Sequence, residues 1–459
     1  MWFRRDLRLA DNPALVAAAE ATDGPVLGVF VLDPALVGPS GAPRLAVLYR
    51  TLRQLDAQLG GTLVVRHGKP ATVLPELCRQ LGASSVHCAA DFGPYGATRD
   101  QAVADALEVL KVQLVRTGSP YAVPPGQLRN GSGSNYQVYS GFYRAWLDRG
   151  WPRPVPAVPV DWVAAGTVHS EAIAPDPELR AELRLPDVGE VAGLRAWRAF
   201  LDGPIERYRE DRDRPDRNGT SRMSVHLKWG TVHPRTLLAD LGPRHEVYRK
   251  ELAWREFYAD VLHARPDTAR DYYRPELRGL RHANRETGRS RLQAWAAGRT
   301  GYPIVDAGMR QLLAEGWMHN RVRMIVASFL VKDLHLEWRV GARHFLGHLV
   351  DGDLASNNHG WQWVAGTGTD PAPYFRIFNP SLQGQKFDPD GSYVRRYVPE
   401  LAGLPADYIH EPWRSPDGLP PGYPARIVDH ATERAASLAD YNAVKGSNAV
   451  TGRNAGKDR

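Results

Sequence analysis

The segment 355–366, ASNNHGWQWVAG, sets two tryptophans one residue apart behind a pair of asparagines. If this segment is helical, Trp361 lies one turn after Asn357 on the same face, whereas Trp363 points about 200° away from Trp361. One face then offers an amide beside an indole, and the opposite face offers a second indole. The pattern predicts a helix whose two faces serve two different neighbours.

Tryptophan is concentrated around this segment, since six of the thirteen tryptophans fall between Trp254 and Trp363, interleaved with Arg, Asn and Asp. Aromatic rings mixed with cations can stack on bases and neutralise phosphates. Large helical proteins also bury tryptophans in their cores, and for any single ring that is the simpler interpretation. For the whole set, the polar residues at helical offsets favour binding.

The stretch KELAWREFY (250–258) places Glu251 and Trp254 three residues apart, on one face of a predicted helix. A carboxylate beside an indole can accept hydrogen bonds from a base edge while the ring stacks on the base. Taken alone, the stretch favours an ordinary amphipathic helix with a solvated Glu251.

The stretch GWMHNRVRM (316–324) places Asn320 and Met324 four residues apart on one face, with Arg321 and Arg323 pointing elsewhere. An arginine fork suits phosphate or carboxylate. The alternative is a surface helix with ordinary charges.

Two further stretches contain residues that can cap a helix or bind a ligand. In NGTSRMS (218–224), Thr220 or Ser221 is a candidate helix cap, and the free N–H groups beyond it suit a phosphate. In DGDLASNN (351–358), two aspartates precede the asparagine pair. No His or Glu cluster accompanies them, so we expect no metal site.

The elements that must position these residues divide the chain into two kinds of structure. Short apolar runs at 25–34, 61–68, 84–90 and 112–118 indicate buried parallel strands, and helical spacing separates them at 42–59, 70–82 and 97–110. This βαβ succession predicts a doubly wound, Rossmann-like α/β domain. No Gly-x-Gly-x-x-Gly turn follows its first strand, so we do not predict a dinucleotide site there. The chain starts inside what should be that first strand, which therefore looks truncated.

Helical periodicity dominates after about residue 191, and a Gly/Pro-rich loop region at 366–424 precedes a predicted helix at 425–443. We therefore predict an α/β domain over 1–118, a Pro/Gly/Ser-rich connector over 119–190, an all-α domain over 191–445 and a disordered tail over 446–459.

Composition restricts the class of protein. A chain of 459 residues with 43% hydrophobic and 24% charged residues is typical of a globular protein with more than one domain. Its net charge of +7 favours a polyanionic partner. Only Cys78 and Cys88 are present, which favours a reducing, cytoplasmic setting. No apolar run is long enough for a membrane span, and no signal-peptide pattern follows the start.

Four longer stretches carry a family resemblance: WFRRDLRLADNPAL, ELAWREFY, AWAAGRTGYPIVDAGMRQLLAEGWMHNRVRMIVASFLVKDL and DGDLASNNHGWQWVAGTGTDPAPYFRIFNP. Through them the chain resembles the photolyase/cryptochrome family from Trp2 to about Trp413, and it most resembles class I cyclobutane pyrimidine dimer photolyases. The resemblance implies a carbon–carbon lyase that binds UV-damaged DNA, flips a pyrimidine dimer out of the duplex and splits it by light-driven electron transfer from reduced FAD.

The resemblance also implies site residues. FAD would lie folded inside the helical domain, with Asn357 facing flavin N5 and Arg323 paired with Asp351. The implied cofactor-binding positions are Tyr208, Thr220, Ser221, Arg222, Met223, Ser224, Tyr248, Arg323, Asp351, Gly352, Asp353 and Asn357.

On the substrate side, Glu251 would hydrogen-bond the dimer and stabilise its charge, and Trp254 and Trp363 would stack against the flipped bases. The implied DNA-binding positions are Glu251, Trp254, Arg255, Tyr258, Asn320, Arg321, Met324 and Trp363, with Arg212 and Gln383 as weaker contacts. Glu251, Asn357, Trp361 and Trp338 are the implied catalytic residues.

One departure concerns flavin photoreduction, which the family carries out through three tryptophans. Trp361 and Trp338 match the inner two, but Arg285 stands at the distal position. Two alternatives follow: photoreduction is slow, or the electron comes from another aromatic residue, Trp295 or a tyrosine. We expect Trp361→Phe to abolish photoreduction and to spare repair by chemically reduced protein.

Two features bear on the subtype. Relatives that repair (6-4) photoproducts carry a histidine pair where this chain has Asn320 and Met324, and plant-type cryptochromes usually have Asp at the position of Asn357. Both favour dimer repair. The segment DFGPYG (91–96) resembles members that bind an 8-hydroxy-deazaflavin antenna, with folate, FMN or an empty pocket as alternatives.

The resulting expectation is a monomeric, cytoplasmic DNA repair enzyme. A cryptochrome-type blue-light photoreceptor with little repair activity is the first alternative. A flavoprotein that binds nucleic acid without photochemistry is the second.

Overall fold

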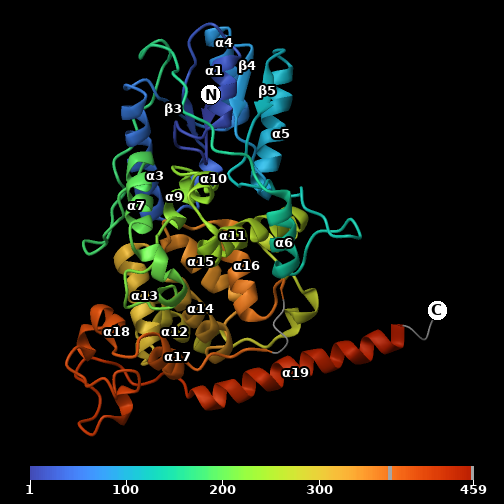
Figure 1. Cartoon of the computed structure of the whole chain (residues 1–459). Coiled ribbons are helices and arrows are strands. Elements are labelled where there is room, and N and C mark those ends of the chain that lie inside the picture. The colour runs from blue at the N-terminus through green and yellow to red at the C-terminus, as the bar shows by residue number, and fades with distance from the viewer. Residues whose placement is uncertain (371–374, 456–459) are drawn as a thin grey trace.

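The computed structural model describes residues 1–370 and 375–455, with side chains through residue 445. An α/β domain forms one end of the molecule and a helical domain forms the other, as Figure 1 shows. This arrangement confirms the predicted fold class.

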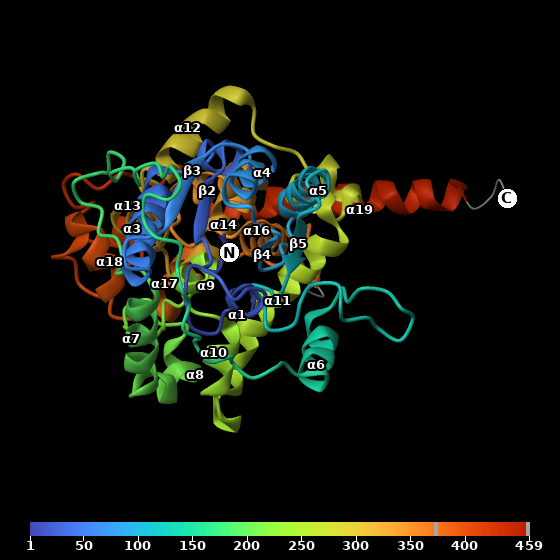
Figure 2. The same cartoon turned by 90° about the horizontal axis from the view of Figure 1, so that it is seen from above.

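Five short parallel strands lie at the predicted places. Hydrogen bonds join them as a three-stranded sheet in the order β1-β2-β3 and a two-stranded sheet, β4-β5. β4 packs beside β1, so the spatial order is β3-β2-β1-β4-β5, a doubly wound arrangement that Figure 2 shows from above. The strands are β1 (Trp2–Phe3), β2 (Val29–Leu32), β3 (Val64–His67), β4 (Ser85–Cys88) and β5 (Gln113–Arg116).

Successive strand residues point to opposite faces, and each face has its own core. Phe3 and Phe30 pack with residues of α1 and α3, whereas Trp2 and Val29 pack with residues of α4 and α5. Both faces are thus covered by helices, which is why the central strands β1 and β2 are apolar and buried along their whole length. The covering helices are α1 (Pro13–Glu20), α3 (Ala42–Gln58), α4 (Pro70–Leu81) and α5 (Pro94–Glu108); a short α2 (Pro34–Val37) follows β2.

The predicted connector contains a helix that the Pro/Gly-rich composition concealed, α6 (Tyr139–Arg149). Trp146 in α6 is fully buried, and its Nε1 donates a 2.6 Å hydrogen bond to Glu256. The same carboxylate accepts hydrogen bonds from the backbone N–H groups of Ala122 and Val123. This part of the connector is therefore packed against the helical domain.

The helical domain contains two large cores, one built around α11 and one around α13–α16. Between residues 190 and 370, and again from 375, helices and turns alternate, as the periodicity predicted. The α-helices are α7 (Glu190–Leu201), α8 (Tyr208–Asp211), α9 (Ser224–Trp229), α10 (Pro234–Ala239), α11 (Glu246–Ala264), α12 (Arg285–Ala296), α13 (Pro303–Glu315), α14 (Asn320–Ser328), α15 (Trp338–His348), α16 (Leu354–Ala365), α17 (Pro380–Phe387), α18 (Ser392–Tyr397) and α19 (His430–Ala455).

The C-terminal region differs from expectation. The helix predicted at 425–443 begins at His430, after a Pro-containing segment, and continues to Ala455. The tail that we expected to be disordered is thus helical over 446–455, and residues 456–459 lie outside the described part of the chain. Extending an existing helix costs no new nucleation, so weak helix formers can follow strong ones. Figure 1 shows α19 projecting along the lower edge of the molecule.

The two domains meet at Gly230, the left-handed C-cap of α9. A Cβ at this position would lie 1.8 Å from the Arg5 carbonyl oxygen, so only glycine allows this approach. Arg5 also forms a 2.7 Å ion pair with Asp353 at the start of α16. The N-terminal segment therefore holds the start of α16 in place.

Candidate active site

A cavity of about 490 Å³ lies in the helical domain. Its volume falls in the range of small-molecule and cofactor sites. Its walls come from α8, α9, α11, α14, α15 and α16, and from the loops before α9 and α16. All twelve predicted cofactor-binding residues line it, together with Glu251, Trp254, Tyr258, Asn320, Arg321, Met324, Trp361, Trp363, Arg212 and Arg255.

One wall is the turn that leads into α9. Arg222 there has a φ of 52°, a strained conformation for a residue with a side chain. Ser221 Oγ lies 2.8 Å from Tyr248 Oη, which ties the turn to α11. No side chain of the described residues caps the start of α9 at Ser224. Hydroxyl and backbone N–H groups therefore gather at this wall, as the phosphate-binding interpretation requires.

A second wall pairs α14 with the loop before α16. Arg323 forms a 2.8 Å ion pair with Asp351 Oδ2, as predicted, and donates a second hydrogen bond to the Met318 carbonyl. The other carboxylate oxygen, Oδ1 of Asp351, is buried and has no hydrogen-bond partner among the described residues. A buried acceptor of this kind fits a ligand that brings its own N–H or O–H donor.

Cations surround the start of α16. Asp353 caps the helix by accepting a 3.1 Å hydrogen bond from the Ser356 N–H group. Burial alone would raise the pKa of Asp353. The nearby cations Arg5, Lys228 and Arg255 lower this pKa by more than burial raises it, so the carboxylate stays ionised. Burial, aided by Arg5, lowers the pKa of Lys228 to about 7. The cluster carries more positive than negative charge, which suits a diphosphate.

α16 presents its residues as the spacing predicted. Asn357 donates both amide protons within the protein, to the Ala342 carbonyl at 3.1 Å and to Asn358 at 2.9 Å, so its amide oxygen is the group left for a ligand. Trp361 lies on the same face and is 3% exposed. This face can therefore meet a flavin ring edge with an acceptor and an indole.

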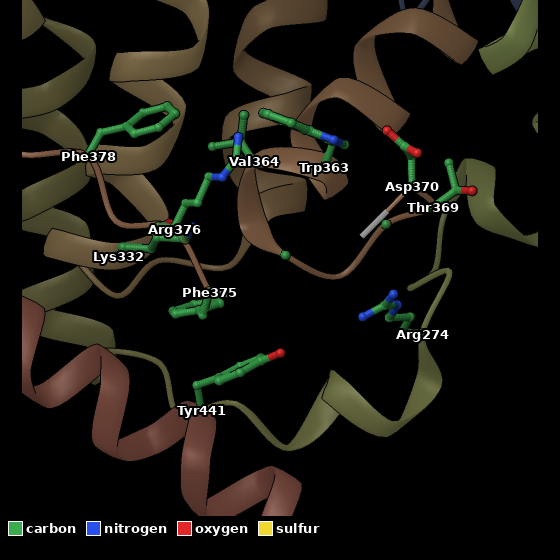
Figure 3. A pocket seen from close by; sticks show the side chains of 12 residues that line it. Arg274, Lys332, Trp363, Val364, Thr369, Asp370, Phe375, Arg376, Phe378 and Tyr441 are labelled. Atoms are coloured by element: carbon green, nitrogen blue, oxygen red, sulfur yellow. Dashed lines mark hydrogen bonds between the residues drawn. The ribbon is translucent and has the colours of Figure 1, made fainter. Parts of the chain in front are cut away.

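Trp363 stands on the opposite side of α16, between the large cavity and a smaller pocket of about 40 Å³. Figure 3 shows this pocket with Trp363 at one side and the Phe375 and Tyr441 rings at the other. The Phe375 and Tyr441 rings are stacked with their centroids 4.2 Å apart, so the segment that begins at residue 375 packs against α19. The Trp363 indole thus packs against the core of the helical domain and also separates the two cavities.

The substrate-side residues form a polar and aromatic rim. Glu251 and Arg212 form a 2.8 Å ion pair. Burial raises the pKa of Glu251, and Arg212 lowers it only in part. The Trp254 ring is stacked on Tyr139 with centroids 3.7 Å apart, so one of its faces is already covered. The other face of Trp254 can stack on a planar ring. The Glu251 carboxyl, when protonated, can donate a hydrogen bond to an acceptor on the edge of that ring.

Three predicted residues lie elsewhere or face a different way. Trp338 is buried at the start of α15 and does not line the cavity. Gln383 lies on α17 beside a separate pocket. Arg255 reaches the cavity, but its guanidinium donates to the Pro120 and Leu227 carbonyls and lies over the Tyr121 ring, so it joins the connector to the helical domain instead of pointing to DNA.

Several lining or supporting residues were missed from the sequence. Lys228 lies four residues after Ser224 on the same face of α9, a spacing that would have revealed it. Trp317 also lines the cavity and has the Arg222 guanidinium 4.3 Å from its ring centroid. Arg5 and Tyr139 come from distant segments, and no local pattern pointed to them.

Neither a metal centre nor a membrane span is found among the described residues. No group of three or more His, Cys, Asp or Glu side chains there is arranged to hold a metal ion. No described helix is both long and apolar enough to cross a membrane.

Comparison with known proteins matches nearly the whole chain. Residues 1–160 match the DNA photolyase family, and residues 248–443 match the FAD binding domain of DNA photolyase. The deoxyribodipyrimidine photo-lyase of Halobacterium salinarum is 39% identical over 97% of this chain and 99% of the relative.

Solved structures from the same family have a similar fold over nearly the whole chain. A class III photolyase from Agrobacterium tumefaciens has a TM-score of 0.86 and 37% identity, and covers 97% of each chain. A cryptochrome from Synechocystis has a TM-score of 0.85 at 26% identity, over 95% of this chain and 98% of that one. The cavity in the helical domain, lined by aromatic and charged side chains, fits the FAD-binding domain that the family match identifies, and the chain belongs to the DNA photolyase family.

Proposed function

We propose that this protein is a deoxyribodipyrimidine photolyase, which splits cyclobutane pyrimidine dimers in UV-damaged DNA in a light-dependent reaction. The observation that carries the proposal is that flavin-type and base-type binding residues share one cavity. Asn357 and Trp361 stand on one side of it, and Glu251 and Trp254 stand on another. An electron donor and its acceptor would then lie next to each other.

FAD, when bound, supplies the electron that opens the dimer and takes it back afterwards. The diphosphate would be held by the 220–224 turn and the cationic cluster around Asp353. The Asn357 amide oxygen would accept a hydrogen bond from the flavin edge. The protein's part is to hold the two partners and to exclude water.

Glu251 has the chemistry for the dimer. Burial raises its pKa, which favours a protonated carboxyl that donates a hydrogen bond to a pyrimidine carbonyl. The free face of Trp254 and the indole of Trp363 supply stacking. Asn320 and Met324 line the same cavity and offer no ionisable group, which supports dimer repair over (6-4) repair.

One assay separates this function from its alternatives. UV-damaged oligonucleotide is incubated with reduced protein, with and without blue light, and the remaining dimers are measured. Light-dependent loss of dimers supports repair. Binding without loss would instead support a cryptochrome-type photoreceptor or a flavoprotein without photochemistry, and the 26% identity to a cryptochrome makes the first of these the alternative to test.

Arg321 gives a prediction for the DNA contact. Its guanidinium lies at the cavity edge, paired with Asp213 at 2.8 Å and 20% exposed. If it meets a phosphate, Arg321→Ala should weaken binding to damaged and undamaged DNA alike, and should reduce the slope of log K against log salt by about 0.9. Binding titrations at several salt concentrations measure this slope. Arg414→Ala, which changes an exposed arginine paired with Glu411 outside the cavity, is the control. An equal slope in both variants would contradict the role of Arg321.

We further propose a class I enzyme with an 8-hydroxy-deazaflavin antenna, with folate or FMN as alternatives. The class III relative is 37% identical, so class I rests on the sequence motifs. At the carboxyl ends of β2 and β4, where α/β sheets bind ligands, Tyr95 is 40% exposed and its hydroxyl bonds Asp33, and Leu36 is 47% exposed. Absorption spectra of the chromophores released on denaturation identify the antenna.

A monomer in the cytoplasm completes the proposal. Both cysteines are free and buried, which accords with a reducing compartment. Light scattering during gel filtration measures the oligomeric state.

A further inference from the structure

A row of aromatic rings leads from the cavity into the core beside α15. Trp361 lines the cavity, and its six-membered ring presses on α15 so closely that a Cβ at Gly341 would lie 2.2 Å from it. Trp338 lies three residues before Gly341, on the same face of α15, and belongs to the same core cluster as Trp361. The Tyr272 ring meets Trp338 edge-on, with centroids 6.1 Å apart.

A second row starts at Trp361 but stays within the core. Trp295 lies 6.2 Å from Trp361 and is fully buried. Beyond it, the ring contacts of the described residues reach Phe345 and His344 and no further tryptophan or tyrosine. An electron vacancy on Trp295 therefore has no easily oxidised neighbour to move to, except back to Trp361.

The proton acceptors differ along the two rows. The Nε1–H groups of Trp361 and Trp338 are buried and have no hydrogen-bond partner among the described residues. An oxidised indole at either place keeps its proton, so the vacancy is not trapped there. Trp295 donates to the Val326 carbonyl, which is too weak a base to take the proton.

Tyr272 differs from these tryptophans because a carboxylate stands beside its hydroxyl. Burial and the Glu337 carboxylate raise the pKa of Tyr272. Glu337 also accepts a 2.7 Å hydrogen bond from Arg339, whose guanidinium lies 5.7 Å from the Tyr272 ring. Glu337 and Arg339 side chains are 18% and 43% exposed, so a proton taken here can leave to solvent.

We propose that Tyr272 is the terminal electron donor for photoreduction in this protein, acting through Trp338 and Trp361, with Glu337 as the acceptor of its phenolic proton. This role rests on the proposed function, because it requires bound FAD. Arg285, at the position of the missing distal tryptophan, cannot supply the electron.

The step balances as follows. Trp361 gives one electron to photoexcited oxidised flavin, Trp338 refills Trp361, and Tyr272 refills Trp338. Tyr272 loses one electron and passes its hydroxyl proton to Glu337, which leaves a neutral tyrosyl radical. A soluble thiol then gives one electron and one proton to the Tyr272 radical and becomes a thiyl radical, two of which combine as a disulfide. The electron that left Trp361 stays on the flavin, and the proton on Glu337 passes to solvent.

The test is flash spectroscopy and electron paramagnetic resonance of the full FAD-loaded protein. The wild type should give a tyrosyl radical after the flash. Tyr272→Phe, which keeps the ring packing, should lose that signal, and the separated charges should recombine. Glu337→Gln should slow the formation of the radical.

Two matched variants control for general damage. Tyr273→Phe changes the neighbouring tyrosine, and Trp295→Phe changes the second row; both should keep the tyrosyl signal. A tyrosyl signal that persists in Tyr272→Phe, or that disappears in Trp295→Phe, would overturn the proposal. A protein that binds no FAD would show no photoreduction in any variant, which would instead contradict the proposed function.

Discussion

Trp361→Phe is expected to abolish the light-driven reduction of oxidised FAD, while protein that has been reduced chemically still repairs dimers in light. Trp361 both lines the cofactor side of the cavity and contacts the α15 face that carries Trp338. Phenylalanine is far harder to oxidise than tryptophan, so the route from Tyr272 is interrupted at its first step. Repair starts from flavin that is already reduced and needs no electron from this row.

The measurement has two arms, flavin absorbance under illumination with a thiol and dimer loss after chemical reduction. Trp413→Phe, a partly buried tryptophan outside the cavity, is the matched control and should retain both. Thermal unfolding checks the packing, since removing part of a buried indole should cost about 1–3 kcal/mol. Loss of repair in fully reduced Trp361→Phe would show that this residue also acts in repair itself.

Glu251→Ala is expected to remove most of the preference for damaged DNA. A hydrogen bond that involves a charged or strongly polarised group contributes about 1.5–3 kcal/mol, so affinity for a dimer-containing oligonucleotide should fall about 10- to 100-fold. Affinity for undamaged DNA should change little, because it depends on phosphate contacts. Competition binding with the two oligonucleotides measures both values.

The pH dependence follows from the direction of the pKa shift. Glu251 has a raised pKa because burial, aided by the nearby Asp213 carboxylate, outweighs the lowering effects of the Arg212 ion pair and of Arg321. The protonated form, which can donate to a pyrimidine carbonyl, is present below that pKa and is lost above it. Binding of damaged DNA should therefore weaken as pH rises through the pKa of Glu251.

Two variants distinguish this role from a structural one. Glu251→Gln keeps a donor at all pH values, so it should retain more of the preference and lose the pH dependence. Glu246→Gln changes an exposed glutamate of the same helix, paired with Lys250, and should alter neither. Equal losses on damaged and undamaged DNA in Glu251→Ala would assign Glu251 to folding of the rim.

Much of the local structure could be predicted from the sequence because it depends on short-range periodicity. Apolar runs located the strands, and helical spacing put Asn357 and Trp361 on one face with Trp363 on the other. The connector was harder. α6 lies in a stretch rich in Pro and Gly, and its stability comes from burying Trp146 against α11, a contact that no local pattern encodes.

The site divides in the same way. From the sequence alone, residue types and their offsets determined which side chains share a helix face, and the motifs determined the family. Only the tertiary structure brought the 220–224 turn, α11, α14 and α16 around one cavity and turned Arg255 toward backbone carbonyls. It also placed Tyr272 against Trp338 and Glu337. Those contacts join residues far apart in the chain, and their partners are selected by packing and burial of the whole domain, which no window of sequence contains.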